Sequence, residues 1–354
     1  MKRFATTALL VGISATSSAQ TFTVGTASAA RGQTAYGAIT VPAGVDSGLV
    51  MQVAVINGAK PGPVVAFVSG SHGTEYVSIV ALQRFIGAVD PAALSGTVIV
   101  APLLNVASME QMVPHINPVD RKGMNASYPG DPSGTQSERA LALVAQQIVK
   151  PATVIVDLHG GDLDEDLRPY SYWIRTGNPT QDAASKILAM AFGLDMIIVR
   201  DVDATNPASA RSLSGYALSL GKTTFVAEAG RAGMVEPEAV DALVNGSLNV
   251  LTALKMTVRP LGPPPSVVYV GGDQRVRSEK PGMFFKTVER GSYVVKGQKV
   301  GSLTDYVGRS AGDVLAPQSG IVTFIRPVPS AGVGATLVTV AQLYGETAPP
   351  YKRP

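Results

Sequence analysis

A repeated unit dominates the central part of the sequence: a short apolar run, then a loop, then a segment with helical periodicity. The runs are continuous and rich in β-branched residues, which is typical of strands buried on both faces of a largely parallel sheet. They lie at residues 64–68, 97–101, 153–156, 196–199 and 223–227. Because strands that alternate with helices must be covered on both sides, this unit favours an α/β sandwich.

The helical segments complete this prediction. Residues 76–88 and 138–149 carry apolar side chains at three- and four-residue spacing, and residues 236–256 form a third candidate. Residues 20–60 resemble short strands and turns, with a turn at Lys60-Pro61-Gly62-Pro63. The 37 glycines and 25 prolines exclude a helical bundle or coiled coil. We therefore predict a three-layer α/β sandwich over residues 20–262, with a mostly parallel, mixed sheet and an N-terminal β segment.

A proline-rich segment ends the alternation of predicted strands and helices. Three successive prolines at residues 263–265 cannot continue a helix and favour an extended linker. Residues 266–345 contain short strands, frequent glycine and no convincing helical pattern. We predict a small, all-β C-terminal domain there.

The first residues have the layout of a secretory signal peptide. Lys2 and Arg3 precede about ten apolar or small residues, and Ser17-Ser18-Ala19 offers small residues at a cleavage site. The apolar part is too short to span a bilayer, which needs about 20 residues. The sequence therefore predicts cleavage of residues 1–19 near Ala19, a periplasmic or secreted protein and no stable membrane insertion afterwards.

Composition narrows the possible chemistry. The chain has no cysteine, so disulfides, thiol nucleophiles and thiolate metal sites are excluded. The net charge is only +3, and no run of five or more Lys or Arg occurs. The sequence therefore does not indicate the basic patch that is typical of nucleic-acid-binding proteins.

Two of the three histidines occupy matching places in the repeated unit. His72 follows the first apolar run and His159 follows the third, and each precedes a glycine. Ligands bind at the carboxyl edge of open α/β sheets, so both imidazoles can meet there. Glu75 lies three residues after His72, where Tyr76 begins the helical segment, and this spacing makes two side chains neighbours on one helix face. Two imidazoles and a carboxylate form a catalytic zinc site with a position left for water, although two structural histidines and a helix-start glutamate fit the same pattern.

Carboxylates at the same edge could assist such a site. Glu228 follows the fifth apolar run and is the natural general base for activating water. A structural salt bridge, for example with Arg231, is the alternative. Asp157 lies two residues before His159 and could orient that imidazole, although a capping or backbone contact fits equally well.

Four short segments resemble, in order, the motifs of the succinylglutamate desuccinylase/aspartoacylase family, which is related to the zinc carboxypeptidases. Gly-Ser-His-Gly-Thr-Glu at residues 70–75 is similar to its first zinc motif, and Asp-Leu-His at 157–159 to its second. Asn-Ala-Ser-Tyr-Pro-Gly at 125–130 resembles its substrate-binding block, and Glu-Ala-Gly at 228–230 its catalytic motif. The resemblance covers roughly residues 36–345.

The resemblance implies specific roles and a zinc carboxypeptidase-like fold. His72, Glu75 and His159 would hold one Zn²⁺ per chain. Glu228 would activate a water and pass its proton to the leaving nitrogen, and Asn125 would hydrogen-bond the substrate. The implied substrate is a small N-acyl amino acid or related compound.

One departure from the family pattern concerns substrate recognition. The family has an arginine after the asparagine, where its guanidinium clamps a carboxylate, but this chain has Ala126. A second arginine expected about ten residues upstream is replaced by the segment around His115, itself either an electrophile or an exposed loop histidine. The arginines that could substitute are Arg121, Arg168, Arg211 and Arg231.

The C-terminal region has a resemblance of its own. Residues 291–300 resemble a turn of biotinyl and lipoyl carrier domains, but the later hairpin lacks their lysine. A barrel-sandwich-like lid over the active site is therefore the prediction.

The leading hypothesis is an exported zinc hydrolase that cleaves the amide bond of a small N-acyl amino acid and could form a homo-oligomer. A carboxypeptidase-like enzyme acting on short or cell-wall peptides, and a non-catalytic zinc- or ligand-binding protein on this fold, are the alternatives.

Overall fold

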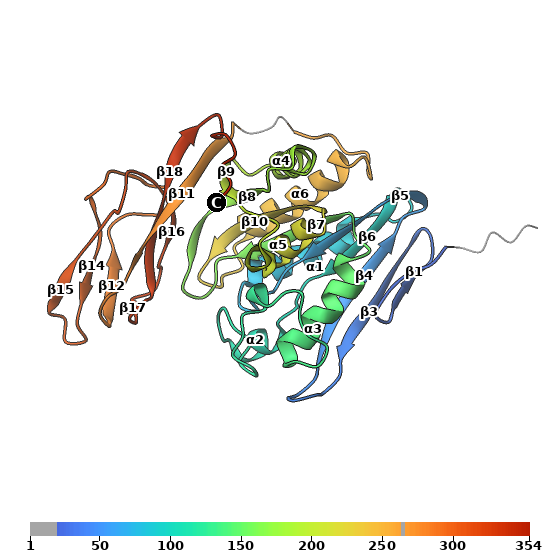
Figure 1. The fold of residues 1–354 in the computed structure, drawn as a ribbon, viewed down its shortest axis with the longest axis horizontal. Helices are drawn as coiled ribbons and strands as arrows, with labels where there is room; N and C mark the ends of the chain where they lie inside the picture. Colours follow the sequence, from blue (N-terminus) through green and yellow to red (C-terminus); the bar gives the residue numbers. More distant parts are fainter. Residues whose placement is uncertain (1–19, 263–265) are drawn as a thin grey trace, which may run out of the picture.

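The computed structural model describes residues 20–262 and 266–354, and its main feature is a twelve-stranded mixed sheet (Figure 1). The strands run in the order β13-β16-β18-β11-β9-β8-β10-β7-β5-β6-β4-β3. The segments predicted to be a signal peptide and a proline linker, residues 1–19 and 263–265, lie outside the described residues. No helix among the described residues is long and apolar enough to cross a membrane.

The strands before the linker form most of this sheet. They are β3 (Gln33–Val41), β4 (Leu49–Asn57), β5 (Lys60–Val68), β6 (Ser95–Ala101), β7 (Val154–Gly160), β8 (Asp166–Arg175), β9 (Met196–Asp201) and β10 (Thr223–Arg231), whereas β1 (Phe22–Val24) and β2 (Ala27–Ala29) form a separate two-stranded sheet. Strands β6, β5, β7 and β10 are parallel neighbours, whereas β8 is antiparallel to β10. All five predicted apolar runs correspond to strands, with Thr153 alone lying just before β7, and the predicted mixed α/β sheet is confirmed.

Helices cover both faces of this part of the sheet. They are α1 (Tyr76–Ala88), α2 (Val106–Gln111), α3 (Gln136–Val144), α4 (Pro179–Phe192), α5 (Leu213–Ser219) and α6 (Pro237–Ala253), with short turns η1 (Met124–Ala126), η2 (Ala145–Val149) and η3 (Pro207–Ala210). Val65 and Phe67 of β5 pack in the core beneath α1, α4 and α6, while the alternate residues Ala66 and Val68 pack beneath α3 and α5. Burial on both faces explains why these strands are continuous apolar runs.

Several element predictions need correction. The segment predicted to be a turn at Lys60–Pro63 is the start of β5. Strand β8 was not predicted, because it contains Pro169 and charged residues rather than a continuous apolar run. Helices α2, α4 and α5 were not predicted either. Helix α3 begins at Gln136, two residues earlier than predicted, since Thr135 and Glu138 form a capping box at its start.

The strands after the linker are β11 (Val268–Arg277), β12 (Gly282–Lys286), β13 (Tyr293–Val294), β14 (Lys299–Thr304), β15 (Ser310–Leu315), β16 (Gly320–Ile325), β17 (Ser330–Ala331) and β18 (Thr336–Gly345). Four of them form a separate sheet in the order β15-β14-β12-β17. The others extend the main sheet, because β11 pairs in parallel with β9, and β16 pairs with β8. The C-terminal strands are therefore hydrogen-bonded to the α/β part, and the division at residues 262 and 266 stays a prediction.

Candidate active site

Adjacent strands place His159 and Glu228 side by side. Both residues lie within their strands, β7 and β10, rather than in the loops after them as predicted. They are register partners in a parallel pair, so both side chains project from the same face of the sheet. On the other side of β10, Glu228 is paired in register with Tyr170, whose hydroxyl donates to Glu228 Oε2 at 2.5 Å.

The loop after β5 brings His72 and Glu75 to the same place, but not on one helical face. Glu75 occupies the N-cap position of α1 with φ −83° and ψ 61°, outside the helical region. A turn brings the residues together, in which the Glu75 amide donates to the His72 carbonyl at 3.3 Å. The turn starts at Gly70, whose φ of +65° is a conformation that glycine adopts without strain.

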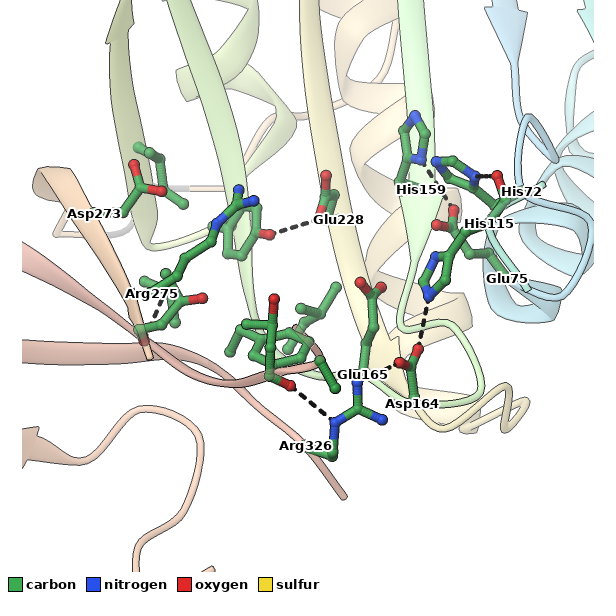
Figure 2. Close-up of a pocket in the computed structure, with 18 of the residues that line it drawn as sticks. His72, Glu75, His115, His159, Asp164, Glu165, Glu228, Asp273, Arg275 and Arg326 are labelled. Atoms are coloured by element: carbon green, nitrogen blue, oxygen red, sulfur yellow. Dashed lines mark hydrogen bonds and ion pairs between the residues drawn. The ribbon is translucent and has the colours of Figure 1, made fainter. Parts of the chain in front are cut away.

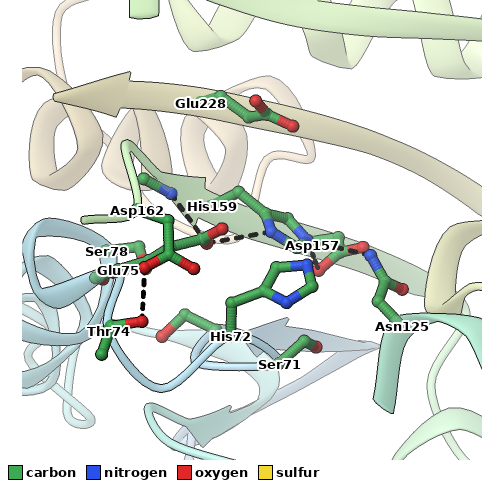
Figure 3. A network of polar contacts seen from close by, with 12 residues as sticks. Ser71, His72, Thr74, Glu75, Ser78, Asn125, Asp157, His159, Asp162 and Glu228 are labelled. Atoms are coloured by element: carbon green, nitrogen blue, oxygen red, sulfur yellow. Dashed lines mark hydrogen bonds and ion pairs between the residues drawn. The ribbon is translucent and has the colours of Figure 1, made fainter. Parts of the chain in front are cut away.

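The three predicted metal ligands form one cluster. Ligand atoms of His72, Glu75 and His159 all lie within 4.8 Å of one another. His159 Nδ1 is 3.0 Å from Glu75 Oε2, and the same oxygen accepts from the Gly160 amide at 2.9 Å (Figure 3). Two imidazoles and a carboxylate are a common donor set for catalytic zinc.

Neighbouring groups orient both imidazoles. His159 Nε2 is 3.2 Å from Asp157 Oδ1, and neither of the two buried Asp157 oxygens has a hydrogen-bond partner among the described residues. A proton on Nε2 suits this carboxylate and leaves Nδ1 free to bind a metal. His72 Nδ1 lies 3.1 Å from the His115 carbonyl, which requires a proton on Nδ1 and leaves Nε2 free. The residues present therefore fit a bound zinc ion.

The electrostatics of the cluster favour positive charge within it. Burial raises the pKa of Glu75, but the charges of His159 and His72 outweigh this effect and lower the pKa overall. Burial lowers the pKa of His159, but Glu75 and Asp157 raise it well above its ordinary value. In a protein without metal, Glu75 and Asp157 retain a proton on the His159 imidazole, and the same carboxylates would stabilise a metal cation.

Glu228 stands apart from the ligand cluster. Burial and the charge of Glu75 raise the pKa of Glu228, against the opposing effects of His159 and the Tyr170 hydroxyl. Arg231 pairs with Glu236 at 3.0 Å instead, so the alternative of a salt bridge between Arg231 and Glu228 is wrong. A partly buried carboxylate with a raised pKa beside a metal-ligand cluster is able to exchange protons with a substrate.

Asn125 also reaches the cluster. Its Nδ2 lies 3.3 Å from His159 Nε2, a contact between two N–H groups when Nε2 carries the proton directed at Asp157, and its Oδ1 accepts from the Leu213 amide at 2.9 Å. The side chain thereby joins turn η1 to the start of α5.

Two adjoining cavities surround these groups. A larger one of about 440 Å³ extends from the cluster toward the C-terminal strands (Figure 2), and a second of about 350 Å³ extends toward the loop before α5. Both are lined by His159, Glu228, Asn125, Tyr172 and Arg275. The candidate chemical groups therefore lie where the two cavities meet.

His115 lines the larger cavity, although its side chain is also partly exposed to solvent. His115 Nε2 is 2.8 Å from Asp164 Oδ1, and Arg326 of the segment after β16 donates to Asp164 Oδ2 at 2.6 Å. Burial lowers the pKa of His115, but the Asp164 hydrogen bond and the charges of Asp162 and Glu165 raise it to about 9. His115 is therefore protonated at neutral pH, in a charged chain that ends at the C-terminal strands.

None of the four arginines suggested as replacements for the family clamp lines either cavity; these are Arg121, Arg168, Arg211 and Arg231. Arg168 pairs with Asp195, and Arg211 donates to the carbonyl of the exposed Ala126. The cavities are lined instead by Arg200, Arg275, Arg277 and Arg326. Arg200 follows a predicted strand, so the rule that identified the histidines would have found it, but no sequence signal places Arg275 there.

An α/β sheet with two imidazoles and two carboxylates gathered at the carboxyl edge of its parallel strands is typical of metal-dependent hydrolases. Comparison with known proteins gives the family. Residues 61–254 match the succinylglutamate desuccinylase/aspartoacylase catalytic domain, and the chain belongs to this family of N-acyl amino acid deacylases. The family resemblance of the sequence motifs is thus confirmed.

Individual relatives extend the match beyond the catalytic domain. The chain is 26% identical over 319 residues to N-alpha-acetyl-L-2,4-diaminobutyric acid deacetylase of Halomonas elongata, covering 88% of each protein. A succinylglutamate desuccinylase/aspartoacylase from Rhodobacter sphaeroides has a similar fold, with TM-score 0.78, 23% identity and coverage of 88% of this chain and 95% of that one. The product-bound ectoine utilization protein EutE (DoeB) of Ruegeria pomeroyi has TM-score 0.79 and 20% identity, with coverage of 87% and 95%.

Proposed function

We propose that this protein is an exported, zinc-dependent hydrolase that cleaves the amide bond of a small N-acyl amino acid. The observation that carries the proposal is the register pairing of His159 with Glu228, which sets a separate carboxylate beside a three-residue metal-ligand cluster. The activity named for the Halomonas relative, removal of an acetyl group from an amino acid derivative, supports this substrate class. Export is proposed from the signal-like N-terminal sequence.

The residues divide the work between metal binding and proton transfer. His72, Glu75 and His159 would hold the zinc ion, with Asp157 and the His115 carbonyl fixing the two imidazoles. When bound, zinc supplies Lewis acidity, which polarises a carbonyl and lowers the pKa of water.

Glu228 is the proposed general base. Its carboxylate would take a proton from the attacking water and deliver it to the leaving amine nitrogen. The Tyr170 hydroxyl holds the Glu228 carboxylate in place, and the amide of Asn125 would orient the substrate on the opposite side of His159.

Substrate profiling tests the proposal. Purified residues 20–354 are assayed with Nα-acetyl amino acids, including Nα-acetyl-L-2,4-diaminobutyrate, and with dipeptides and cell-wall peptides. We expect release of acetate that a chelator abolishes and zinc restores. Cleavage of peptides alone would support the peptidase alternative, and failure to cleave any substrate with zinc bound would support the binding-protein alternative.

A further inference from the structure

We propose that Arg200 and Arg275 form a binding site for a carboxylate group of the substrate, in the smaller cavity beside Glu228. The inference rests on the proposed function, because it assumes that an amide substrate occupies the junction of the two cavities. It assigns the part of the cavity that recognises the substrate to residues outside the family motifs.

The smaller cavity has the composition of an anion site. Arginine, serine and amide side chains line it, and Glu228, at its junction with the larger cavity, is the one carboxylate among them. The polar and charged lining residues are Asn125, His159, Tyr172, Arg200, Ser209, Ser212, Ser214, Glu228 and Arg275. The larger cavity is of mixed charge, because three arginines line it together with five carboxylates; these are Arg275, Arg277, Arg326, Glu75, Asp164, Glu165, Glu228 and Asp273. An anionic group is therefore favoured in the smaller cavity.

Both guanidinium groups are available to a ligand. Among the described residues, neither Arg200 nor Arg275 has a hydrogen bond or an ion pair, whereas Arg175 pairs with Asp201 at 2.6 Å and Arg326 with Asp164 at 2.6 Å. The Arg200 guanidinium lies over the Tyr172 ring, 4.9 Å from its centroid, and the charges of Asp273 and Glu228 act on it without a hydrogen bond. Arginine presents five N–H donors in a planar fork that matches a carboxylate, so such unpaired groups form a ready receptor.

A local irregularity in β11 aims Arg275 at the cavity. Strand β11 is parallel to β9 only as far as Val270, and its register with β18 shifts between Gly271 and Gln274. A Cβ on Gly271 would lie 2.8 Å from the Tyr344 ring and 2.9 Å from the Val199 carbonyl, and Gly272 has φ +57°. The glycines thus permit the strand to leave its neighbour, and the Arg275 side chain extends into the cavity near Glu228 (Figure 2).

Two parts of an amide substrate could carry the carboxylate. It is the α-carboxylate if the amino acid part enters the smaller cavity, or a terminal carboxylate if a dicarboxylic acyl group does. Glu228, the proposed proton donor to the leaving nitrogen, lines the smaller cavity, and the α-carboxylate is borne by the carbon attached to that nitrogen, so we assign the site to the α-carboxylate.

Calorimetric titration of the Glu228→Gln protein, which is designed to bind without turnover, tests the assignment. The zinc-loaded mature chain is titrated with three derivatives of L-2,4-diaminobutyrate. The first is the Nα-acetyl compound, which has an α-carboxylate, and the second is its α-carboxamide, which has no carboxylate. The third is the Nα-succinyl α-carboxamide, which has a carboxylate on the acyl group only. We expect the first ligand to bind at least about 30-fold more tightly than the second, and Arg275→Gln or Arg200→Gln to reduce this ratio at least about tenfold. Binding of the α-carboxamide should change less than about threefold.

Controls and other outcomes separate this inference from the proposed function. Arg309→Gln removes the same charge from a residue 81% exposed in the β14–β15 hairpin, and should leave the ratio unchanged. A ratio unaffected by both cavity substitutions, or no binding of either carboxylate ligand at millimolar concentration, overturns the inference. Selective binding of the succinyl ligand would show that the two arginines bind a carboxylate of the acyl group and not the α-carboxylate. Arginine-dependent binding without turnover by the wild-type enzyme would sustain the inference and refute the proposed hydrolase.

Discussion

The two sides of the active-site cavity differ in whether their polar side chains already have partners within the protein. On the side formed by β5, β7 and β10, the proposed chemical groups already have partners, as His159 contacts Glu75 and Asp157 and Glu228 accepts from Tyr170. On the side formed by β9 and β11, Arg200 and Arg275 have no hydrogen-bond partner among the described residues. Groups that perform chemistry are held in position before substrate arrives, whereas groups that recognise substrate remain free to bind it.

The largest expected effect comes from removing a metal ligand from the preorganised side. His159→Ala should reduce zinc from about one ion per chain to almost none, because one of three protein ligands is lost. Turnover should fall by more than about 1,000-fold, since the Lewis acid is lost with the zinc. Metal analysis of the purified protein and an acetate-release assay measure both. Full zinc content in His159→Ala would show that the cluster is not the metal site.

A smaller effect should distinguish ligand from base on the same side. Glu228→Gln keeps the size of the side chain but cannot accept a proton, so turnover should fall at least about 100-fold while zinc stays bound. Glu75→Gln should lose zinc first, because its carboxylate lies 3.0 Å from His159 Nδ1 within the ligand cluster. If Glu228→Gln releases the metal and Glu75→Gln retains it, the two roles are exchanged.

The smallest effect concerns the charged chain that links the two sides. The folded pKa of His115 is about 9, above its ordinary value of 6.5, so its contribution to stability is complete below pH 6.5 and is lost as pH rises through about 9. The side chain is 42% exposed, and solvent screening limits the contribution to about 1 kcal/mol, or roughly 1–2 °C in Tm for a chain of this length.

Thermal melting of wild type and His115→Gln at pH 6 and pH 10 measures this contribution. The wild type should exceed the variant at pH 6 and lose that advantage at pH 10. An equal difference in Tm at both pH values would mean that His115 stabilises the fold through packing rather than charge.

The sequence predicted the chemical side of the cavity better than the recognition side. His72, His159 and Glu228 each follow a continuous apolar run, and parallel strands bring such ends to one edge, so their proximity could be predicted from local pattern. The prediction that His72 and Glu75 are neighbours on one helical face was wrong, because Glu75 occupies the N-cap position of α1 and does not lie within the helix.

The recognition side depends on contacts that local pattern does not encode. Arg275 reaches the cavity through the pairing of β11 with β9 and the irregularity at Gly271, across a proline segment that suggested a separate domain. Strand β8, which supplies Tyr170 and Tyr172, was hidden because Pro169 and its charged residues interrupt the apolar pattern. Tertiary pairing determined these positions, and no periodicity in the sequence records it.

The pairing of β11 with β9 also affects how the chain can be divided. Met196 and Ile198 of β9 pack with Val270 and Ala341 from the C-terminal strands, and β16 pairs with β8. A fragment ending at residue 262 would therefore present a bare strand edge and an uncovered apolar surface, which is a template for aggregation. Synthesis of residues 20–262 alone should therefore yield insoluble protein. A chimera that takes its C-terminal segment from a relative must preserve the β11–β9 and β16–β8 pairings in order to fold.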